Sequence, residues 1–188
     1  MLITFEGIDG SGKTTLVEKI VDKIENKKIF VTKEIFVTKE PTKDMEAEDP
    51  LALAFLFMAD RVEHTEKIKK RIKEGKIVLC DRYCDSTYAY QGVLISEKYN
   101  LEINKTIEHL KKAHDLFALK PDVTFLVDVS AKTGVERKGG GDEKFLERVR
   151  NVYLKLAKEE KERFVVLDGR KDQKELVDEV LRVLGPKF

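Results

Sequence analysis

The sequence lacks tryptophan, has only two cysteines, and contains no long apolar run. Its longest apolar stretch, residues 51–59, is far shorter than the ~18 residues that a membrane-spanning helix requires, which excludes a helical membrane protein. Cys80 and Cys84 do not have the spacing of a zinc site, and two thiols suit a reducing compartment. The first six residues lack the basic start and the cleavage site of a secretory signal. We therefore expect a cytoplasmic protein.

An excess of charge of one sign is also missing. The 36 basic and 35 acidic residues leave a formal net charge of +1, so we expect no nucleic-acid partner, because such binding relies on a basic field. The charged fraction of 38% exceeds the usual ~25%, and this density of Lys and Glu hints at a heat-adapted source. With 188 residues and no Pro/Gly/Ser-rich linker, residues 1–188 are expected to form one domain.

Short apolar runs alternate with longer stretches of helical periodicity. We expect buried strands at residues 2–5, 77–80, 123–127 and 164–167. Helices are expected at residues 13–25, 50–73, 100–119, 144–162 and 172–185. Strands rich in Val, Ile and Leu that alternate with helices indicate an α/β fold, in which helices cover both faces of a parallel sheet.

The segment IFVTKE occurs twice in succession, at residues 29–34 and 35–40. Because six is an even number, either copy could occupy a strand without turning its side chains to the other face. We expect one copy to form the second strand, which brings the sheet to five strands. The other copy is then a local duplication, although a role in regulation or dimerisation stays open.

The strongest motif is GIDGSGKT at residues 7–14, a complete match to G-x-x-x-x-G-K-[ST]. It follows a predicted strand and opens a predicted helix, which is the context that a phosphate-binding loop requires. Its glycines let backbone N–H groups surround phosphate oxygens, Lys13 adds a positive charge, and the Thr14 hydroxyl can bind Mg²⁺. The alternative, a glycine-rich turn without a ligand, would not need the Lys and the Thr.

A second polar pair, Asp81 and Arg82, follows the strand at residues 77–80. Ligands of open α/β sheets bind at the carboxyl ends of the strands, so Asp81 can assist the metal and Arg82 can grip a phosphate. A strand cap and a solvated arginine are the plainer alternatives. The guanine-reading Asn-Lys-x-Asp segment of GTPases is absent from the sequence.

Together with these motifs, FEGIDGSGKTT (residues 5–15), DRY (81–83) and STYAYQG (86–92) resemble the thymidylate kinase family of P-loop nucleoside monophosphate kinases. Shorter matches at residues 39–41, 57–61 and 145–156 extend the similarity over nearly the whole chain. The resemblance implies a P-loop kinase fold with a short lid at about residues 137–144. It also implies phosphoryl transfer from ATP to dTMP with Mg²⁺, giving ADP and dTDP for dTTP synthesis, usually in a homodimer.

The resemblance also implies roles for individual residues. Catalysis would fall to Lys13, Asp9 and Arg82. ATP would be bound by Gly7, Ile8, Asp9, Gly10, Ser11, Gly12, Lys13, Thr14 and Thr15, with Arg137 against adenine. The acceptor would be bound by Asp9, Glu40, Pro41, Phe57, Arg61, Arg82, Ser86, Thr87, Tyr90 and Gln91. Mg²⁺ would be held by Thr14, Asp9 and Asp81.

Within the acceptor group, Phe57 would stack on thymine, and Arg61 and Arg82 would hold the phosphate. Tyr90 and Gln91 would crowd the sugar and exclude a ribose 2′-hydroxyl. From pattern alone, Phe57 could equally belong to the core and the tyrosines could simply pack. The three histidines, His64, His109 and His114, lie in Lys/Glu-rich helical surroundings, so we expect them on the surface and outside the site.

Three departures from the family pattern concern loops. The sequence has Lys39-Glu40-Pro41-Thr42 where the family has Arg-Glu-Pro-Gly-Gly, and Gly10 where some members carry arginine. The arginine-rich lid is replaced by RKGGGDEK at residues 137–144. Lys138, Lys144 or Arg148 could then supply lid charge, and the three glycines favour either a mobile lid or a surface turn.

Two other functions remain compatible with the sequence. The acceptor could be another nucleoside monophosphate, such as dUMP, dCMP or dGMP. The shortened lid also suits a nucleotide-binding regulatory protein with weak catalysis.

Overall fold

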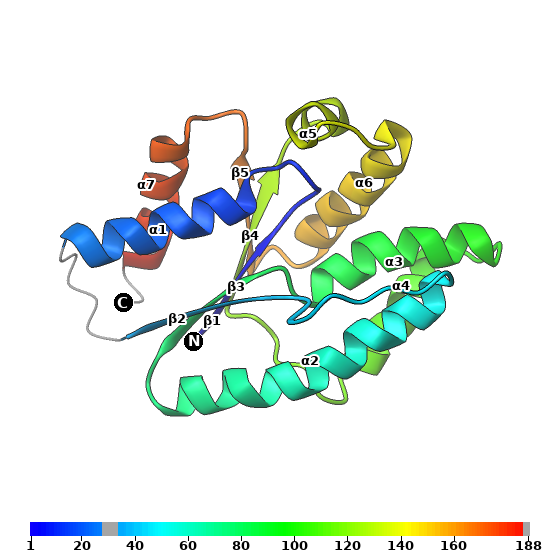
Figure 1. Cartoon of the computed structure of the whole chain (residues 1–188), viewed down its shortest axis with the longest axis horizontal. Helices are drawn as coiled ribbons and strands as arrows, with labels where there is room; N and C mark the ends of the chain where they lie inside the picture. Colours follow the sequence, from blue (N-terminus) through cyan, green and yellow to red (C-terminus); the bar gives the residue numbers. More distant parts are fainter. Residues whose placement is uncertain (28–33, 186–188) are drawn as a thin grey trace.

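A computed structural model describes residues 1–27 and 34–185 of the chain (Figure 1). Five parallel strands form one sheet in the order β2-β3-β1-β4-β5. The strands are β1 (Leu2–Glu6), β2 (Ile35–Lys39), β3 (Ile77–Asp81), β4 (Val123–Asp128) and β5 (Phe164–Asp168). The helices are α1 (Lys13–Lys27), α2 (Pro50–Lys73), α3 (Cys84–Lys98), α4 (Ile103–His114), α5 (Ala131–Lys138), α6 (Glu143–Glu159) and α7 (Gln173–Leu184). The α/β class and the parallel five-stranded sheet are confirmed.

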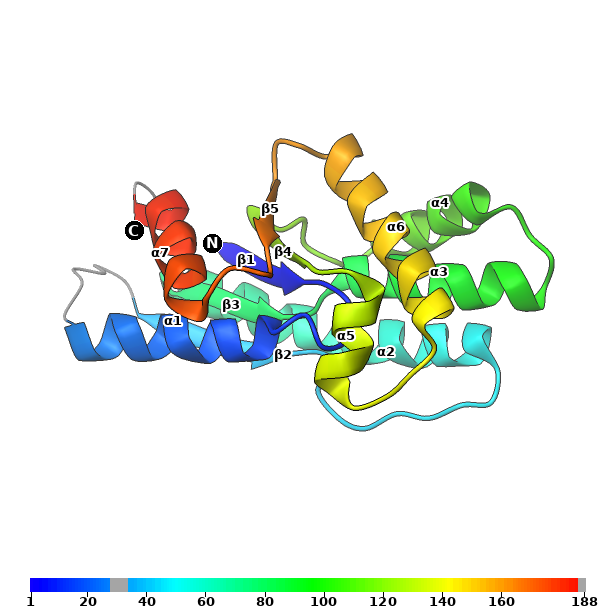
Figure 2. The same ribbon diagram turned by 90° about the horizontal axis from the view of Figure 1, so that it is seen from above.

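Helices cover both faces of the sheet, as Figures 1 and 2 show. Alternation of side chains along β1 sends Ile3 and Phe5 to a core shared with α1 and α7. Leu2, on the other face, joins a core built with α2, α3, α4 and α6. Both faces of the central strands are therefore buried, which explains their nearly continuous apolar sequences.

The second copy of the repeat forms β2, which pairs with β3 from Ile35↔Ile77 to Lys39↔Asp81. One copy therefore serves as a strand, as predicted. The first copy lies outside the described residues except for Glu34, whose carbonyl accepts the Ile77 N–H at 2.9 Å.

Helix boundaries differ from the predictions in the second half of the chain. The helix expected at residues 100–119 is only Ile103–His114, because Glu102 caps it and Asn100 has a left-handed φ of 50°. Two helices, α3 and α5, had no sequence prediction. α3 buries Asp85, Thr87 and Gln91 together with apolar residues, so it shows no helical periodicity of apolar residues. α5 has eight residues and contains a glycine.

The carboxyl ends of β1 and β3 lie side by side, with Phe5 opposite Asp81. The loop after β1 leads into α1, and the turn after β3 leads into α3. Figure 2 shows α5 beside the loop between β1 and α1. Among the described residues, no helix is long and apolar enough to cross a membrane.

Candidate functional site

The loop between β1 and α1 has the backbone of a phosphate-binding loop. Gly7 has φ 147°, and a Cβ there would lie 2.6 Å from the Val127 carbonyl oxygen of β4. Gly10 has φ 75°, and a Cβ there would lie 2.1 Å from the carbonyl oxygen of Gly134 in α5. Only glycine fits these two positions. The loop therefore turns tightly onto the amino end of α1, where free N–H groups attract anions.

Lys13, the first residue of α1, is 6% exposed. Burial, and secondarily the positive charge of Arg82, lowers the pKa of Lys13 to about 8. Ile8 and Ser11 are also buried, whereas Thr14 and Thr15 are exposed on the first turn of the helix. A buried ammonium group is stabilised by a bound phosphate, so this lysine is suited to an anionic ligand.

Thr14 and Asp81 form a pair of oxygen donors at the carboxyl end of β3. The Thr14 hydroxyl donates to Asp81 Oδ2 at 2.5 Å, while the buried Asp81 Oδ1 has no hydrogen-bond partner within residues 1–27 and 34–185. Hard oxygen donors with an unused carboxylate oxygen suit Mg²⁺. No group of three His, Cys, Asp or Glu side chains in the described segments could hold an ion alone. The residues fit a Mg²⁺ that takes its other ligands from phosphates and water.

A cavity of about 180 Å³, counted as the space open to the centre of a water molecule, lies beside the phosphate loop. Its lining residues come from the loop, from the segment after β2, from α2, and from the turn and helix after β3. They are Asp9, Glu40, Pro41, Phe57, Arg61, Arg82, Ser86, Thr87, Tyr90 and Gln91. These are the ten residues that the family resemblance assigned to binding of the acceptor. The structure thus brings them together around one space, and their individual roles stay predictions.

Asp9 joins the phosphate loop to this cavity. Its Oδ1 accepts from Arg82 Nη2 at 2.5 Å, and its Oδ2 accepts from Lys138 Nζ at the end of α5. Its backbone N–H donates to the Tyr90 hydroxyl at 2.8 Å. Burial alone would raise the pKa of Asp9, but Arg82 and Lys138 outweigh it and hold that pKa below its usual value. A carboxylate at this point is therefore ionised and already bound to two cations.

Arg82 is fixed by both its backbone and its side chain. Its φ of 68° lies in the left-handed region, a strained conformation for a residue other than glycine. Its N–H donates to the Phe5 carbonyl at 3.0 Å, and its Nη1 donates to Ser86 Oγ at 3.1 Å. Such strain persists where surrounding bonds determine the geometry, and it is common at functional sites.

Glu6, at the end of β1, holds the turn after β3 that contains Arg82. Its carboxylate accepts the Tyr83 N–H at 2.7 Å and the hydroxyls of Ser86 at 2.6 Å and Tyr153 at 3.0 Å. Burial, with a smaller contribution from Asp85, raises the pKa of Glu6 to about 7. Sequence analysis did not single out Glu6. It orients Ser86, which in turn holds Arg82.

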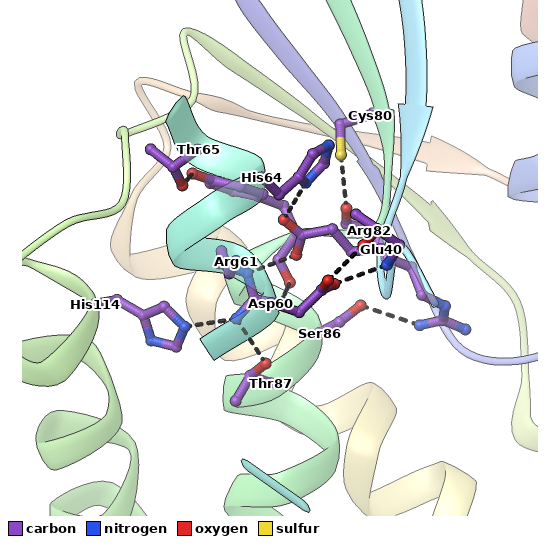
Figure 3. A network of polar contacts seen from close by, with 12 residues as sticks. Glu40, Asp60, Arg61, His64, Thr65, Cys80, Arg82, Ser86, Thr87 and His114 are labelled. Carbon is purple, nitrogen blue, oxygen red and sulfur yellow. Dashed lines mark hydrogen bonds and ion pairs between the residues drawn. The ribbon is translucent and has the colours of Figure 1, made fainter. Parts of the chain in front are cut away.

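Arg61 lies at the back of the cavity with its guanidinium almost fully paired (Figure 3). Its Nε donates to Glu40 Oε2 at 2.5 Å, and its Nη1 donates to Thr87 Oγ1 at 3.1 Å and to His114 Nε2 at 2.6 Å. Nη2 donates to the Tyr83 carbonyl at 3.4 Å. Four of its five N–H groups are therefore used within the described protein, which leaves less of its fork for a phosphate than expected.

Two histidines belong to this network, contrary to the prediction that all three lie on the surface. His64 Nδ1 bonds Glu40 Oε1 at 2.7 Å and is buried, and His114 is buried against Arg61. Only His109 is exposed. The spacing of His64 and His114 from buried residues of the same helices is the signal that could have predicted their burial. His64 lies three residues after Arg61 on α2, and His114 follows Ile107 and Leu110 on the apolar face of α4.

The loop after β2 is ordered where the sequence departs from the family pattern. Thr42, which replaces a glycine, donates both its N–H and its hydroxyl to Asp60 of α2, the N–H at 2.7 Å. Asp60 is buried, so this pairing satisfies a carboxylate that would otherwise be costly. The threonine thus secures the segment that presents Glu40 and Pro41.

The region predicted as a lid, residues 137–144, is helical at both ends, with residues 139–142 as the connection between two helices. Residues 137–138 end α5 and 143–144 begin α6, because Gly139 caps one helix in the left-handed conformation and Asp142 caps the next. Arg137 donates from Nη1 and Nη2 to the Gly169 carbonyl after β5, both at 3.2 Å. Lys138 reaches Asp9, Lys144 is exposed, and Arg148 pairs with Glu97 at 2.5 Å.

Known proteins share sequence with this chain over nearly its whole length. The sequence profile of the thymidylate kinase family matches residues 5–180. The chain belongs to the thymidylate kinase family. It is 39% identical to a probable thymidylate kinase of Methanosarcina barkeri over 98% of this chain and 97% of that one. It is 33% identical to a thymidylate kinase of Mycoplasmopsis agalactiae over 98% and 94% of the two chains.

Structural comparison gives the same family. The crystal structure of thymidylate kinase from Ehrlichia chaffeensis superposes with a TM-score of 0.75 at 32% identity, covering 98% of each chain. The predicted P-loop kinase fold and the family resemblance are therefore confirmed.

Proposed function

We propose that this chain transfers the γ-phosphoryl group of ATP to dTMP, giving ADP and dTDP for dTTP synthesis. The observation that carries the proposal is that the ten-residue cavity meets the phosphate loop at Asp9. A donor phosphate on the loop and an acceptor in the cavity would then lie close to each other, with the Asp9 carboxylate between them. Phosphoryl transfer consists mainly of positioning and charge stabilisation, which this arrangement supplies.

On the donor side, the phosphates of ATP would lie on the N–H groups of residues 7–15, with Lys13 against the β- and γ-phosphates. Mg²⁺ would be held by Thr14 and Asp81, with Asp9 nearby, and would neutralise charge on the phosphates. Arg137, held against the loop after β5, would lie against adenine. Arg82 would contact the transferring group, because it is rigid and adjoins Asp9.

On the acceptor side, Phe57 would stack on thymine and Thr87 would face the edge of the base. Arg61 and Arg82 would meet the acceptor phosphate, with Glu40 and Pro41 closing one wall and Ser86 holding Arg82. Asp9 would accept a hydrogen bond from the 3′-hydroxyl. Tyr90 and Gln91 would fill the space that a ribose 2′-hydroxyl needs, which favours a deoxynucleotide.

An ADP-release assay across dTMP, dUMP, dCMP, dGMP and their ribonucleotide counterparts tests this function. We expect one preferred acceptor, dTMP, with kcat/KM at least about tenfold above the others, the discrimination of one well-placed contact. Preference for another monophosphate would reassign the acceptor. Tight ATP binding without turnover on any of them would instead support a regulatory nucleotide-binding protein.

We also propose a homodimer, built on an apolar face formed by α2, α3 and α4. Phe55, Tyr99 and Leu101 are exposed and line a groove there, and Leu56, next to Phe55 in the chain, is exposed as well. Exposed apolar patches of this kind commonly mark protein interfaces.

Two further assignments concern location and domain organisation. A cytoplasmic location is supported by two free, buried cysteines, Cys80 and Cys84, which suit a reducing compartment. A single kinase domain over residues 1–188 is supported by the one sheet that runs through the described chain.

A further inference from the structure

His114 is a buried titratable residue that the proposed mechanism does not use. It closes α4, and its ring lies between Arg61 on one side and the carbonyl of Leu110 on the other. The side chain is almost completely buried, with the ring of Tyr88 edge-on at 5.2 Å and that of Phe117 at 5.5 Å. The ring therefore has one fixed orientation.

The two partners of the ring determine where its proton lies. The Leu110 carbonyl only accepts, so Nδ1, 2.8 Å away, carries the hydrogen. Arg61 only donates, so Nε2 at 2.6 Å must present a lone pair. The ring is thus neutral and serves as an acceptor. Burial, followed by the charge of Arg61, lowers the pKa of His114 to about 4, which agrees with that state.

The acceptor atom acts on one particular nitrogen of Arg61. Nη1 has two hydrogens, of which one goes to Thr87 and the other to His114. Glu40 holds the Nε side of the same plane. Without His114, a buried N–H of Arg61 would lose its partner. Only the contacts to Glu40, Thr87 and the Tyr83 carbonyl would then remain to hold the guanidinium plane.

We propose that His114 is a positioning residue of the acceptor site, whose neutral Nε2 fixes the plane of Arg61 at the back of the cavity. This inference rests on the proposed function in so far as Arg61 contacts the acceptor. His114 itself lines no part of the cavity, and it acts only through Arg61. Within the described residues, the hydrogen bonds and ring contacts of His114 are with Arg61, Leu110, Tyr88 and Phe117. None of these belongs to the phosphate loop, so we expect ATP binding to be unaffected.

Two substitutions separate this role from simple packing. In His114→Gln, Oε1 lies as many bonds from Cα as Nε2 does and can accept from Arg61 without charge. In His114→Asn, the oxygen is one bond shorter and cannot reach. The control is His109→Gln on the same helix, because His109 makes the same Nδ1 contact to the carbonyl four residues earlier, at 2.7 Å, but is exposed.

KM for dTMP, KM for ATP, kcat and Tm are measured for wild type and the three variants. His114→Asn is expected to raise KM for dTMP about tenfold, the effect of one unpaired buried donor, with KM for ATP within about twofold. His114→Gln is expected to restore KM for dTMP to within about threefold of wild type. His109→Gln should match wild type throughout.

Equal rises in both KM values, a lowered Tm with an unchanged KM for dTMP, or a Gln variant as impaired as the Asn variant would overturn the proposal. If His114→Asn does not fold, His114→Leu, which also lacks the acceptor, replaces it. If wild type prefers another monophosphate, the proposed acceptor is wrong and the same comparison is made with the preferred one. If wild type turns over none, calorimetric dissociation constants for dTMP take the place of KM.

Discussion

Asp9 is the residue of the candidate site at which two cations meet one carboxylate. Arg82 and Lys138 both bind its carboxylate, and Tyr90 contacts its backbone and its side chain. The sequence placed Asp9 in the phosphate loop and next to the acceptor, but it did not reveal these partners. They lie far away in the chain, and only the fold brings them together.

Asp9→Asn should sharply lower turnover while ATP binding is mostly retained. The amide keeps the shape of the side chain, but it removes the charge that holds Arg82 and Lys138. We expect a fall in kcat of about 10²–10³, typical of a misplaced charged group at a transition state. Calorimetric titration with ATP provides the binding measurement. Turnover equal to that of wild type would show that the charge of Asp9 is not needed.

The three cations near the lid should differ in importance. The Arg82 side chain is 18% exposed and rigidly held, whereas that of Lys138 is 55% exposed, and Lys144 projects into solvent. We therefore expect Arg82→Ala to lower turnover by about 10²–10³. Lys138→Ala should cost less, because an exposed lysine loses ordering entropy when it engages, and Lys144→Ala should cost least. Turnover is measured at saturating ATP and dTMP. A lysine variant as impaired as Arg82→Ala would make the residue 137–144 region a dedicated catalytic element.

At the scale of elements, the sequence predicted the strands best. Short apolar runs of Val, Ile and Leu predict buried strands of a parallel sheet whose two faces are covered by helices. α3 escaped prediction because its buried side includes Asp85, Thr87 and Gln91. Asp85 pairs with Arg163 and Thr87 with Arg61, both far away in the chain. The acceptor residues were found through the family resemblance. His64 and His114 were missed because charged neighbours on exposed faces obscured the buried face of each helix.

Deletion of one copy of the repeat should leave an active enzyme. Removal of either copy gives the same amino-acid sequence, so β2 and its pairing with β3 are kept in every case. The connection from Lys27 to Ile35 shrinks to one residue, below the usual two or more, so the last turn of α1 must open. We expect Tm to fall by about 2–4 °C, the effect of about 1 kcal/mol in a chain of this size. Loss of folding or of turnover would mean that both copies are required.

For the molecule as a whole, two buried groups give opposite pH dependences of stability. The raised pKa of Glu6 means that the folded state binds an extra proton between pH 4.5 and 7, so stability falls as pH rises through this range. The lowered pKa of His114 means that the unfolded state binds the extra proton between pH 4 and 6.5, so stability falls as pH drops. The two contributions partly cancel near pH 5–6.

Replacing His114 should remove its contribution to the pH dependence of stability. His114→Gln has no group to protonate, so it escapes the loss of stability that wild type suffers on acidification. Between pH 7 and pH 5 the difference in unfolding free energy should shift by about 2 kcal/mol in favour of the variant. Denaturant unfolding at the two pH values measures it. A constant difference would show that His114 titrates normally in the folded protein.

The assembly state depends on the apolar face of α2, α3 and α4. Phe55→Glu places a charge at a residue that is 61% exposed on that face and should convert the proposed dimer to a monomer. Leu116→Glu is the control, because Leu116 is 87% exposed but does not line the groove. Light scattering after size-exclusion chromatography distinguishes the two states. A monomeric wild type, or a dimer that survives Phe55→Glu, would place the interface elsewhere or remove it.

The contact between Gly10 and Gly134 limits which residues the phosphate loop can carry at position 10. A Cβ on Gly10 would overlap the Gly134 carbonyl, and one on Gly134 would lie 2.7 Å from the Asp9 carbonyl. A substitution at residue 134 cannot relieve the first overlap, because every residue has a backbone carbonyl. An arginine at position 10, which some family members carry, requires α5 to lie farther from the loop. Because α5 ends in Lys138, that shift also moves the lysine away from Asp9. An arginine at position 10 is therefore incompatible with the present position of Lys138 against Asp9.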